Sequence, residues 1–99
     1  MIIVAGYIEV EAAGADEGEA LARAMMAETR KEAGCVVYDI TRSVERPTRY
    51  HVYEEWESLA ALEAHFDMPH MAEFRAGLGR IGVADRKVRR REAGEAVML

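Results

Sequence analysis

The sequence predicts an α+β fold in which strands and helices follow one another in the order β-α-β-β-α-β. Three observations predict it: an apolar stretch at the N-terminus, a pair of β-rich stretches joined by a polar turn, and helical spacing of apolar residues on either side of that pair. This order is the ferredoxin-like pattern, a four-stranded antiparallel sheet with its helices on one face. We expect the 99 residues to form a single domain, residues 1–99.

The first strand and the first helix have clear boundaries in the sequence. Residues 2–10 are almost continuously apolar, which is typical of a strand covered on both faces. The helix is expected to begin at Asp16, with Glu19 completing a capping box, and to end near Ala33. Gly34 then occupies the position of a left-handed C-terminal cap.

A hairpin of two strands is expected in the middle of the chain. Residues 35–42 and 50–56 are rich in Val, Ile, Tyr and Trp, which suit a pleated, half-buried surface. Residues 43–48 between them form a polar turn that contains a proline. On the later strand Glu54 and Trp56 are two residues apart, so they share one face of the sheet.

The second helical region is interrupted. Ser58 is a suitable N-cap for its first part, and Pro69 suits the first turn of a new helix because its missing N–H costs nothing there. An apolar stripe at helical spacing continues through both parts: Leu59, Leu62, Phe66, Met71, Phe74 and Leu78. Gly77 and Gly79 are expected to loosen the chain after this stripe.

The last strand is expected over residues 83–91. Its basic run, residues 86–91, is interpreted as a solvated or edge strand whose charges discourage sheet-to-sheet pairing. A phosphate-binding patch is the alternative, and the acidic remainder of the chain argues against it. The apolar tail, residues 93–99, is expected either to pack on a partner subunit or to fray.

Composition narrows the class of protein. The net charge of −5 gives no reason to expect nucleic-acid binding. A single cysteine, Cys35, permits no internal disulfide, and we expect it to be a small buried hydrophobe. No stretch has the length of a membrane span and the N-terminus does not resemble a signal peptide, so a cytoplasmic location is expected.

The two faces of the predicted sheet lead to an expected homodimer. Helices on one face leave the other face bare, although the first two strands carry apolar residues on both sides. A bare apolar face of that size is unusual on a soluble monomer. We therefore expect two copies to stack their sheets about a two-fold axis.

Residues 54–70 read E-x-W-E-S-x-x-A-L-E-A-H-x-x-x-P-H and resemble the signature of the antibiotic biosynthesis monooxygenase (ABM) superfamily. The G-C-x-x-Y pattern at residues 34–38 and Pro47 in the turn also match, and the resemblance covers nearly the whole chain. It implies a dimeric α+β barrel. In ABM enzymes the strand-end Trp and a helix His are associated with the pocket, so the resemblance favours the Trp56 face as the pocket side.

The resemblance also implies an activity. ABM-type oxygenases oxidise quinols or polycyclic phenols with O2, and the substrate supplies the electrons after a base removes a proton inside an apolar pocket. His65 or His70 is the expected base, and the Trp56 N–H or a Tyr hydroxyl is the expected donor to the developing oxyanion. The substrate is expected to contact these residues: Tyr38, Glu54, Phe66, Met71 and Phe74.

No cofactor is expected. The glycines do not form a phosphate-binding loop, which gives no support for flavin or nicotinamide. His65 and His70 are five residues apart across a helix break, and this is not the i, i+4 spacing that places two imidazoles on one helix face. The expected partners are therefore a small aromatic substrate and O2, with no metal.

Two other functions remain open. The haem-degrading branch of the superfamily uses an Asn on the first strand, and this chain contains no Asn, which argues against haem degradation. A non-catalytic dimeric ligand-binding or stress-response module is the other alternative. In that case Trp56 is a core anchor, and His65 and His70 are structural helix residues.

Overall fold

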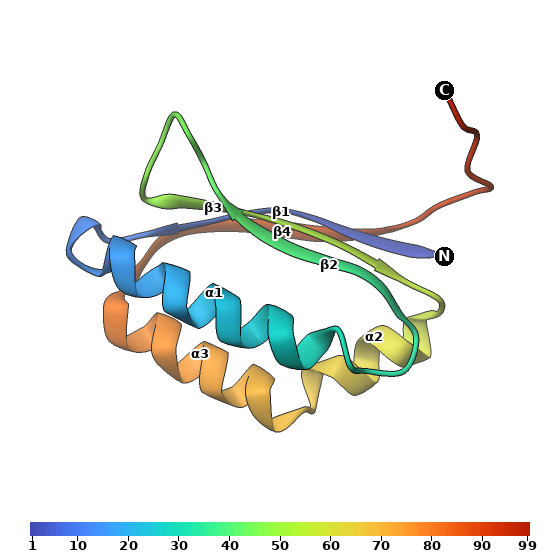
Figure 1. Cartoon of the computed structure of the whole chain (residues 1–99), viewed down its shortest axis with the longest axis horizontal. Coiled ribbons are helices and arrows are strands. Elements are labelled where there is room, and N and C mark those ends of the chain that lie inside the picture. The colour runs from blue at the N-terminus through green and yellow to red at the C-terminus, as the bar shows by residue number, and fades with distance from the viewer.

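The computed structural model describes all 99 residues, and it consists of one sheet with helices on one face (Figure 1). The elements are β1 (Ile2–Val10), a short 3₁₀ turn (Ala12–Gly14), α1 (Ala15–Thr29), β2 (Cys35–Arg42), β3 (Arg49–Trp56), α2 (Leu59–Phe66), α3 (Pro69–Ile81) and β4 (Val83–Glu92). Neighbouring strands are antiparallel, in the order β2-β3-β1-β4. The predicted ferredoxin-like order and sheet are confirmed, with the basic strand β4 at an edge.

The core lies between the sheet and the helix layer. Strand pairing sets Ile2 opposite Trp56 and Val4 opposite Glu54, and these four side chains are buried. Glu54 and Trp56 therefore share the helix-facing side of β3, as their spacing predicted. Burial of this apolar face is the main stabilising contribution in a domain of this size.

The break between α2 and α3 follows the local sequence signals. Ser58 Oγ accepts a hydrogen bond from the Ala61 N–H at 3.1 Å, which confirms Ser58 as the N-cap of α2. Met68 precedes α3 in an extended conformation, and Pro69 is the first residue of that helix. The chain thus changes direction directly after Phe66 and begins a new helix three residues later.

The start of α1 differs from the expected capping box. The helix begins at Ala15, and Gly14 before it offers no side-chain cap. Arg42 of β2 binds both carboxylates instead, with Nη1 at 2.9 Å from Asp16 Oδ1 and 2.7 Å from Glu19 Oε1. Because the helix begins one residue before Asp16, this carboxylate lies inside the first turn and is not the N-cap, and it pairs with Arg42 instead.

The end of α1 also differs from the prediction. The helix stops at Thr29 rather than near Ala33, and residues 30–34 form a turn into β2. In this turn the Glu32 N–H donates to the Thr29 carbonyl at 2.9 Å, and Gly34 has a φ of +82°. The left-handed glycine is therefore correctly placed, but it ends a turn rather than the helix. The early stop directs the Glu32 side chain inward, where it is 5% exposed.

Helix α3 continues through Gly77 and Gly79 to Ile81, further than the sequence predicted. A Cβ added at Gly77 would lie 2.5 Å from Leu21 Cδ2, so this glycine permits close packing of α3 on α1. Gly82, with a φ of +88°, follows the helix. None of the helices combines the length and the apolar character needed to cross a membrane.

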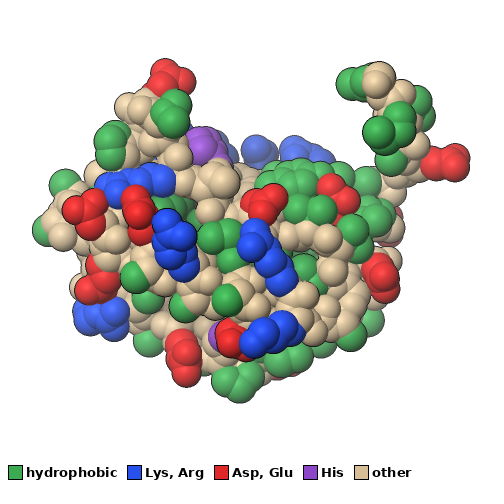
Figure 2. All heavy atoms as spheres, viewed as in Figure 1, with side chains coloured by type: hydrophobic (Ala, Val, Ile, Leu, Met, Phe, Trp, Pro, Cys, Tyr) green, Lys and Arg blue, Asp and Glu red, His purple; other side chains and the backbone are tan.

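The other face of the sheet carries no helix (Figure 1). Ile3, Ala5 and Val37 are half-buried there, and Tyr53 is 39% exposed. The chain beyond Glu92 forms no helix or strand and extends away from the sheet. Its apolar side chains stand clear of the body (Figure 2), namely Val97, Met98 and Leu99.

Candidate functional site

A cavity of about 430 Å³ lies between the sheet and the helix layer. Its floor is formed by apolar side chains of all four strands: Val4, Ile8, Ile40, Val52 and Val88. Its roof is formed by α2 and α3: Leu62, Phe66, Met71, Phe74 and Leu78. Sites for small molecules typically measure about 300–1,000 Å³ and have such apolar walls.

Gly6 lies in β1 between two residues of the floor, Val52 and Val88. It has no side chain to fill the space between them. A Cβ added there would lie 1.8 Å from the Lys87 carbonyl oxygen, so β1 and β4 can pair closely only around glycine.

Three polar side chains line the cavity on its β2–β3 side, and we call them the polar end: Tyr38, Glu54 and His65. Tyr38 stands opposite Glu54 in the sheet, and its ring centroid lies 5.4 Å from that of His65. Burial raises the pKa of Tyr38 well above its usual range, so its hydroxyl stays protonated. The polar end can therefore offer a donor and two titratable groups to a ligand.

Glu54 is a buried carboxyl in largely apolar surroundings. Burial raises its pKa from the ordinary 4.5 to about 7, and the hydrogen bond from the Trp56 Nε1–H to its Oε1, 2.8 Å long, opposes this shift. Both protonation states of Glu54 are therefore populated near neutral pH.

Trp56 lies behind the cavity and does not line it. Its side chain is fully buried, and its only N–H donates to Glu54. Its ring packs against His65, with centroids 4.9 Å apart, and edge-on against Tyr38. The contacts of Trp56 therefore fix the positions of all three residues of the polar end.

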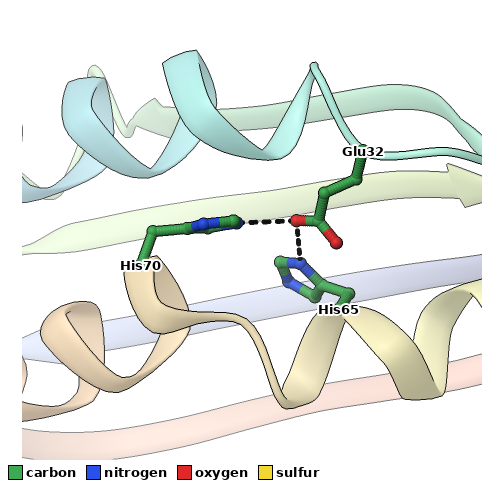
Figure 3. A group of neighbouring side chains, drawn as sticks. All are labelled: Glu32, His65 and His70. Carbon is green, nitrogen blue, oxygen red and sulfur yellow. Dashed lines mark hydrogen bonds and ion pairs between the residues drawn. The ribbon is translucent and has the colours of Figure 1, made fainter.

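Glu32 connects the two helix histidines (Figure 3). Its Oε2 lies 2.7 Å from His65 Nδ1 and 2.7 Å from His70 Nε2. The three residues come from the turn after α1, the end of α2 and the start of α3. His65 is 1% exposed and His70 15% exposed, so the cluster is almost closed to solvent.

The bond to Glu32 fixes the orientation of the His65 ring. Because Nδ1 faces the carboxylate, the opposite nitrogen, Nε2, is free of protein partners on a residue that lines the cavity. Burial lowers the pKa of His65, and the contact with Glu32 opposes that effect. When the imidazole is neutral and its Nδ1–H donates to Glu32, the other nitrogen, Nε2, carries a free lone pair. Nε2 can then accept a proton.

The structure thus brings together most of the residues that the sequence singled out. His65 and all five expected substrate contacts line the cavity: Tyr38, Glu54, Phe66, Met71 and Phe74. His70 and Trp56 do not line the cavity. His70 binds Glu32, and Trp56 binds Glu54. His65 and His70 lack the i, i+4 spacing of a pair on one helix face, but the helix break turns both towards Glu32.

Glu32 was not found from the sequence, although one signal was present. It lies just past the C-terminal end of α1, where the helix dipole favours cations and disfavours carboxylates. An acidic residue at that position is a candidate for a tertiary role. Its partners, however, lie more than thirty residues away, so local patterns do not identify them.

The same cluster is the place where a metal ion could bind. The ligand atoms of Glu32, His65 and His70 lie within 4.8 Å of one another, and a buried oxygen, Glu32 Oε1, has no hydrogen-bond partner. Two imidazoles and a carboxylate suit a divalent cation. Such an ion would bind His65 through Nδ1, which faces Glu32, and would leave Nε2 free.

Cys35 is half-buried and packs against the core. Burial raises the pKa of its thiol, which favours the protonated form. The thiol therefore lacks the low pKa of a reactive cysteine.

Sequence comparison places the chain among known proteins. The family model described as antibiotic biosynthesis monooxygenase matches residues 1–77. An uncharacterised protein of Synechocystis sp. is 33% identical over 73 residues, which make up 74% of this chain and 50% of that protein. The chain thus spans about half the length of this curated relative.

Solved structures share the fold over nearly the whole chain. A protein from Deinococcus radiodurans, named as a candidate antibiotic biosynthesis monooxygenase, has a TM-score of 0.92 and 28% identity, with 100% of this chain and 98% of that chain covered. A protein from Caulobacter crescentus with the same name has a TM-score of 0.86 and 28% identity, with 95% and 90% covered.

Proposed function

The chain belongs to the antibiotic biosynthesis monooxygenase family, and on that premise we propose that it oxidises a quinol or a polycyclic phenol with O2. The observation that supports this most is the polar end of the cavity. There the buried carboxyl of Glu54 and the imidazole of His65, which Glu32 binds, lie beside the apolar walls. Chemistry of this kind takes its electrons from the substrate, so the protein needs to supply only a base, a donor and a dry chamber.

His65 is the proposed base. Its free Nε2 accepts the phenolic proton, while the Glu32 carboxylate holds the ring in place and stabilises the imidazolium that forms. His70 binds the same carboxylate oxygen and acts as a positioning residue. A positioned general base typically contributes a factor of about 10²–10⁴ to the rate.

The reaction balances without a further reductant. A quinol and O2 give a hydroxyquinone and water, and all four electrons come from the quinol. His65 takes a phenolic proton, and the delocalised anion then reduces O2 and forms a C–O bond at a ring carbon. The O–O bond breaks, one oxygen stays on the ring, and the other leaves as water with a proton returned by His65.

Glu54 is the proposed donor to the substrate oxygen on which negative charge develops. Its neutral carboxyl can donate a hydrogen bond there, whereas its ionised form would repel the anion. Trp56 holds Glu54 in place through its N–H. Since the pKa of Glu54 is about 7, turnover should fall as the pH rises through that value.

Oxygen uptake with menadiol tests the proposal, with autoxidation measured without protein and subtracted. We expect His65→Ala to lower the rate about a hundredfold because the base is lost. His51→Ala is the matched control, because His51 is exposed on the outer face of β3. Equal rates for the two variants, both folded by circular dichroism, would remove His65 from the mechanism.

A non-catalytic binding module is the second candidate function. It is favoured by the tight packing of His65, whose buried ring also joins α2 to the turn after α1 through Glu32, as a purely structural histidine would. On this alternative aromatic ligands bind in the cavity, and no quinol or phenol is turned over. Binding of a naphthol without oxygen uptake by any of its dihydroxy derivatives would favour it.

A further inference from the structure

The side of the cavity opposite the polar end is basic. Arg86, Arg89 and Arg90 of β4 line it there, whereas Arg75 of α3 lines the roof beside Phe66, and all four side chains are exposed. We call these four residues the basic rim. Tyr38 and Glu54 of the polar end lie on β2 and β3, whereas β4 is the edge strand beyond β1, so the arginines of β4 lie across the floor from these two residues.

The guanidinium groups of the basic rim have no carboxylate partner. Elsewhere the arginines are mostly paired: Arg30 binds Asp39, and Arg42 binds Asp16 and Glu19. In the basic rim the only side-chain bond goes from Arg75 to the Phe66 carbonyl, at 3.3 Å. In a chain with a net charge of −5, four unpaired arginines around one cavity create a local attraction for anions.

Strand register sets the distance between the two ends of the cavity. Val4 stands opposite Glu54 on β3 and opposite Arg90 on β4. With strands about 4.8 Å apart, the backbones of Glu54 and Arg90 are separated by roughly 10 Å. Arg86 and Arg90 flank Val88 on the floor side of β4, so their stems begin at the cavity.

We infer that the substrate of this cavity carries an acidic group, such as a carboxylate, at the end of the ring system opposite its phenol. The phenol lies at the polar end and the acid at the β4 side of the basic rim, where Arg86 and Arg90 bind it. Arginine is suited to this role because its planar fork can pair with both oxygens of a carboxylate. The inference rests on the proposed function for the phenol, and it adds the substrate class.

The competing explanation is that the arginines only protect an edge strand from pairing with other sheets. Protection of the edge strand needs charged residues on β4 but not at particular positions, and Arg91 on the outer face would serve equally well. It does not require arginine on the floor side of the strand or on α3. The position of the charge therefore separates the two explanations.

Calorimetric titration of the full chain with three phenolic ligands tests the inference, and it is carried out without O2 so that no ligand is oxidised. The ligands are 6-hydroxy-2-naphthoate, 3-hydroxy-2-naphthoate and 2-naphthol, which carry the acid opposite the phenol, beside it, or not at all. We expect the 6-hydroxy acid to bind about tenfold more tightly than 2-naphthol at low salt. This advantage should shrink at high salt, and the 3-hydroxy acid should lack it.

Substitutions locate the effect. The double variant Arg86→Gln and Arg90→Gln should lose the tenfold advantage and keep its affinity for 2-naphthol. Lys87→Gln combined with Arg91→Gln also removes two charges from β4, but from its outer face, and Arg91→Gln alone removes one; both should retain the advantage. Equal affinities of the native chain for all three ligands, an equal loss in either outer-face variant, or no binding at all would overturn the inference. If the double variant Arg86→Gln and Arg90→Gln aggregates but keeps the same ligand preference as the native chain, the inference is also overturned. The arginines would then serve to protect the edge strand.

Failure of the proposed function gives a different result. If the 6-hydroxy acid binds as expected but no dihydroxy derivative supports oxygen uptake, the cavity still selects acidic aromatic ligands and the oxygenase proposal fails. If oxygen uptake occurs equally with charged and uncharged quinols, the oxygenase proposal stands and the acidic-substrate inference fails.

Discussion

Among single residues, Glu54 is the one whose chemistry depends most on the fold. In water its carboxyl would be ionised at neutral pH, but burial beside Tyr38 and Trp56 brings its pKa to about 7. Because the pKa is higher in the folded chain than in the unfolded chain, Glu54 favours folding at low pH. This contribution is complete below about pH 4.5 and is lost as the pH rises through about 7.

Glu54→Gln should remove this dependence on pH. Each unit of pKa shift corresponds to about 1.4 kcal/mol, so the free energy of unfolding of the native chain should fall by up to about 3 kcal/mol, relative to the variant, between pH 4.5 and 7. Urea unfolding of both proteins at several pH values measures the difference. If the free energy of unfolding depended on pH in the same way in both proteins, Glu54 would ionise normally in the folded state.

Local sequence patterns predicted part of the site at the residue scale. The alternation along β3 put Glu54 and Trp56 on one face because strand geometry fixes which residues share a face, and the family resemblance favoured that face as the pocket side. The same pattern did not give the destination of the Trp56 N–H, which is Glu54 rather than a ligand. Glu32 was missed since its partners are defined only by tertiary packing.

At the scale of elements, the break between α2 and α3 is what assembles the site. Ser58 and Pro69 set the helix starts locally, and both were readable in the sequence. Their combined effect, two imidazoles on one carboxylate of the turn after α1, depends on how three elements pack. The length of α1 was mispredicted for the same reason, because tertiary contacts outweighed local capping.

The packing of α3 on α1 can be tested with two glycines of the same helix. A Cβ at Gly77 would meet Leu21 at 2.5 Å, whereas a Cβ at Gly79 would have no neighbour within 4 Å. Gly79→Ala should stabilise the protein through helix propensity, and Gly77→Ala should be less stable than Gly79→Ala by about 2 kcal/mol. Thermal or urea unfolding measures both. Equal stabilisation would mean that the two helices are not in close contact at Gly77.

For the whole molecule, the uncovered sheet face supports the proposal of a homodimer. Ile3, Ala5 and Val37 lie on that face beside the exposed ring of Tyr53, and the apolar tail extends on the same side (Figure 1). The sequence indicated this face through strands that are apolar on both sides. It did not predict the polar network at the other end of the face, where Arg49 stacks on Tyr7 and binds Glu9.

Tyr53→Glu should separate the dimer into folded monomers. The Tyr53 side chain is 39% exposed in the single chain, so the fold tolerates a charge there, but stacked sheets would bury it. Leu59→Glu is the control, since Leu59 is similarly exposed, at 36%, on the helix side. Sedimentation should give a dimer for the native chain and the control. A native monomer at micromolar concentration would contradict the proposed assembly.

The central claim is that the cavity supports oxygen transfer driven by the electrons of the substrate. Its most direct test is turnover of a quinol by chelator-treated protein under ¹⁸O₂, followed by mass spectrometry of the product. We expect one ¹⁸O atom per hydroxyquinone, at a rate unchanged by chelator and lowered by His65→Ala. A product free of ¹⁸O, or turnover that returns only when a metal is added, would contradict it.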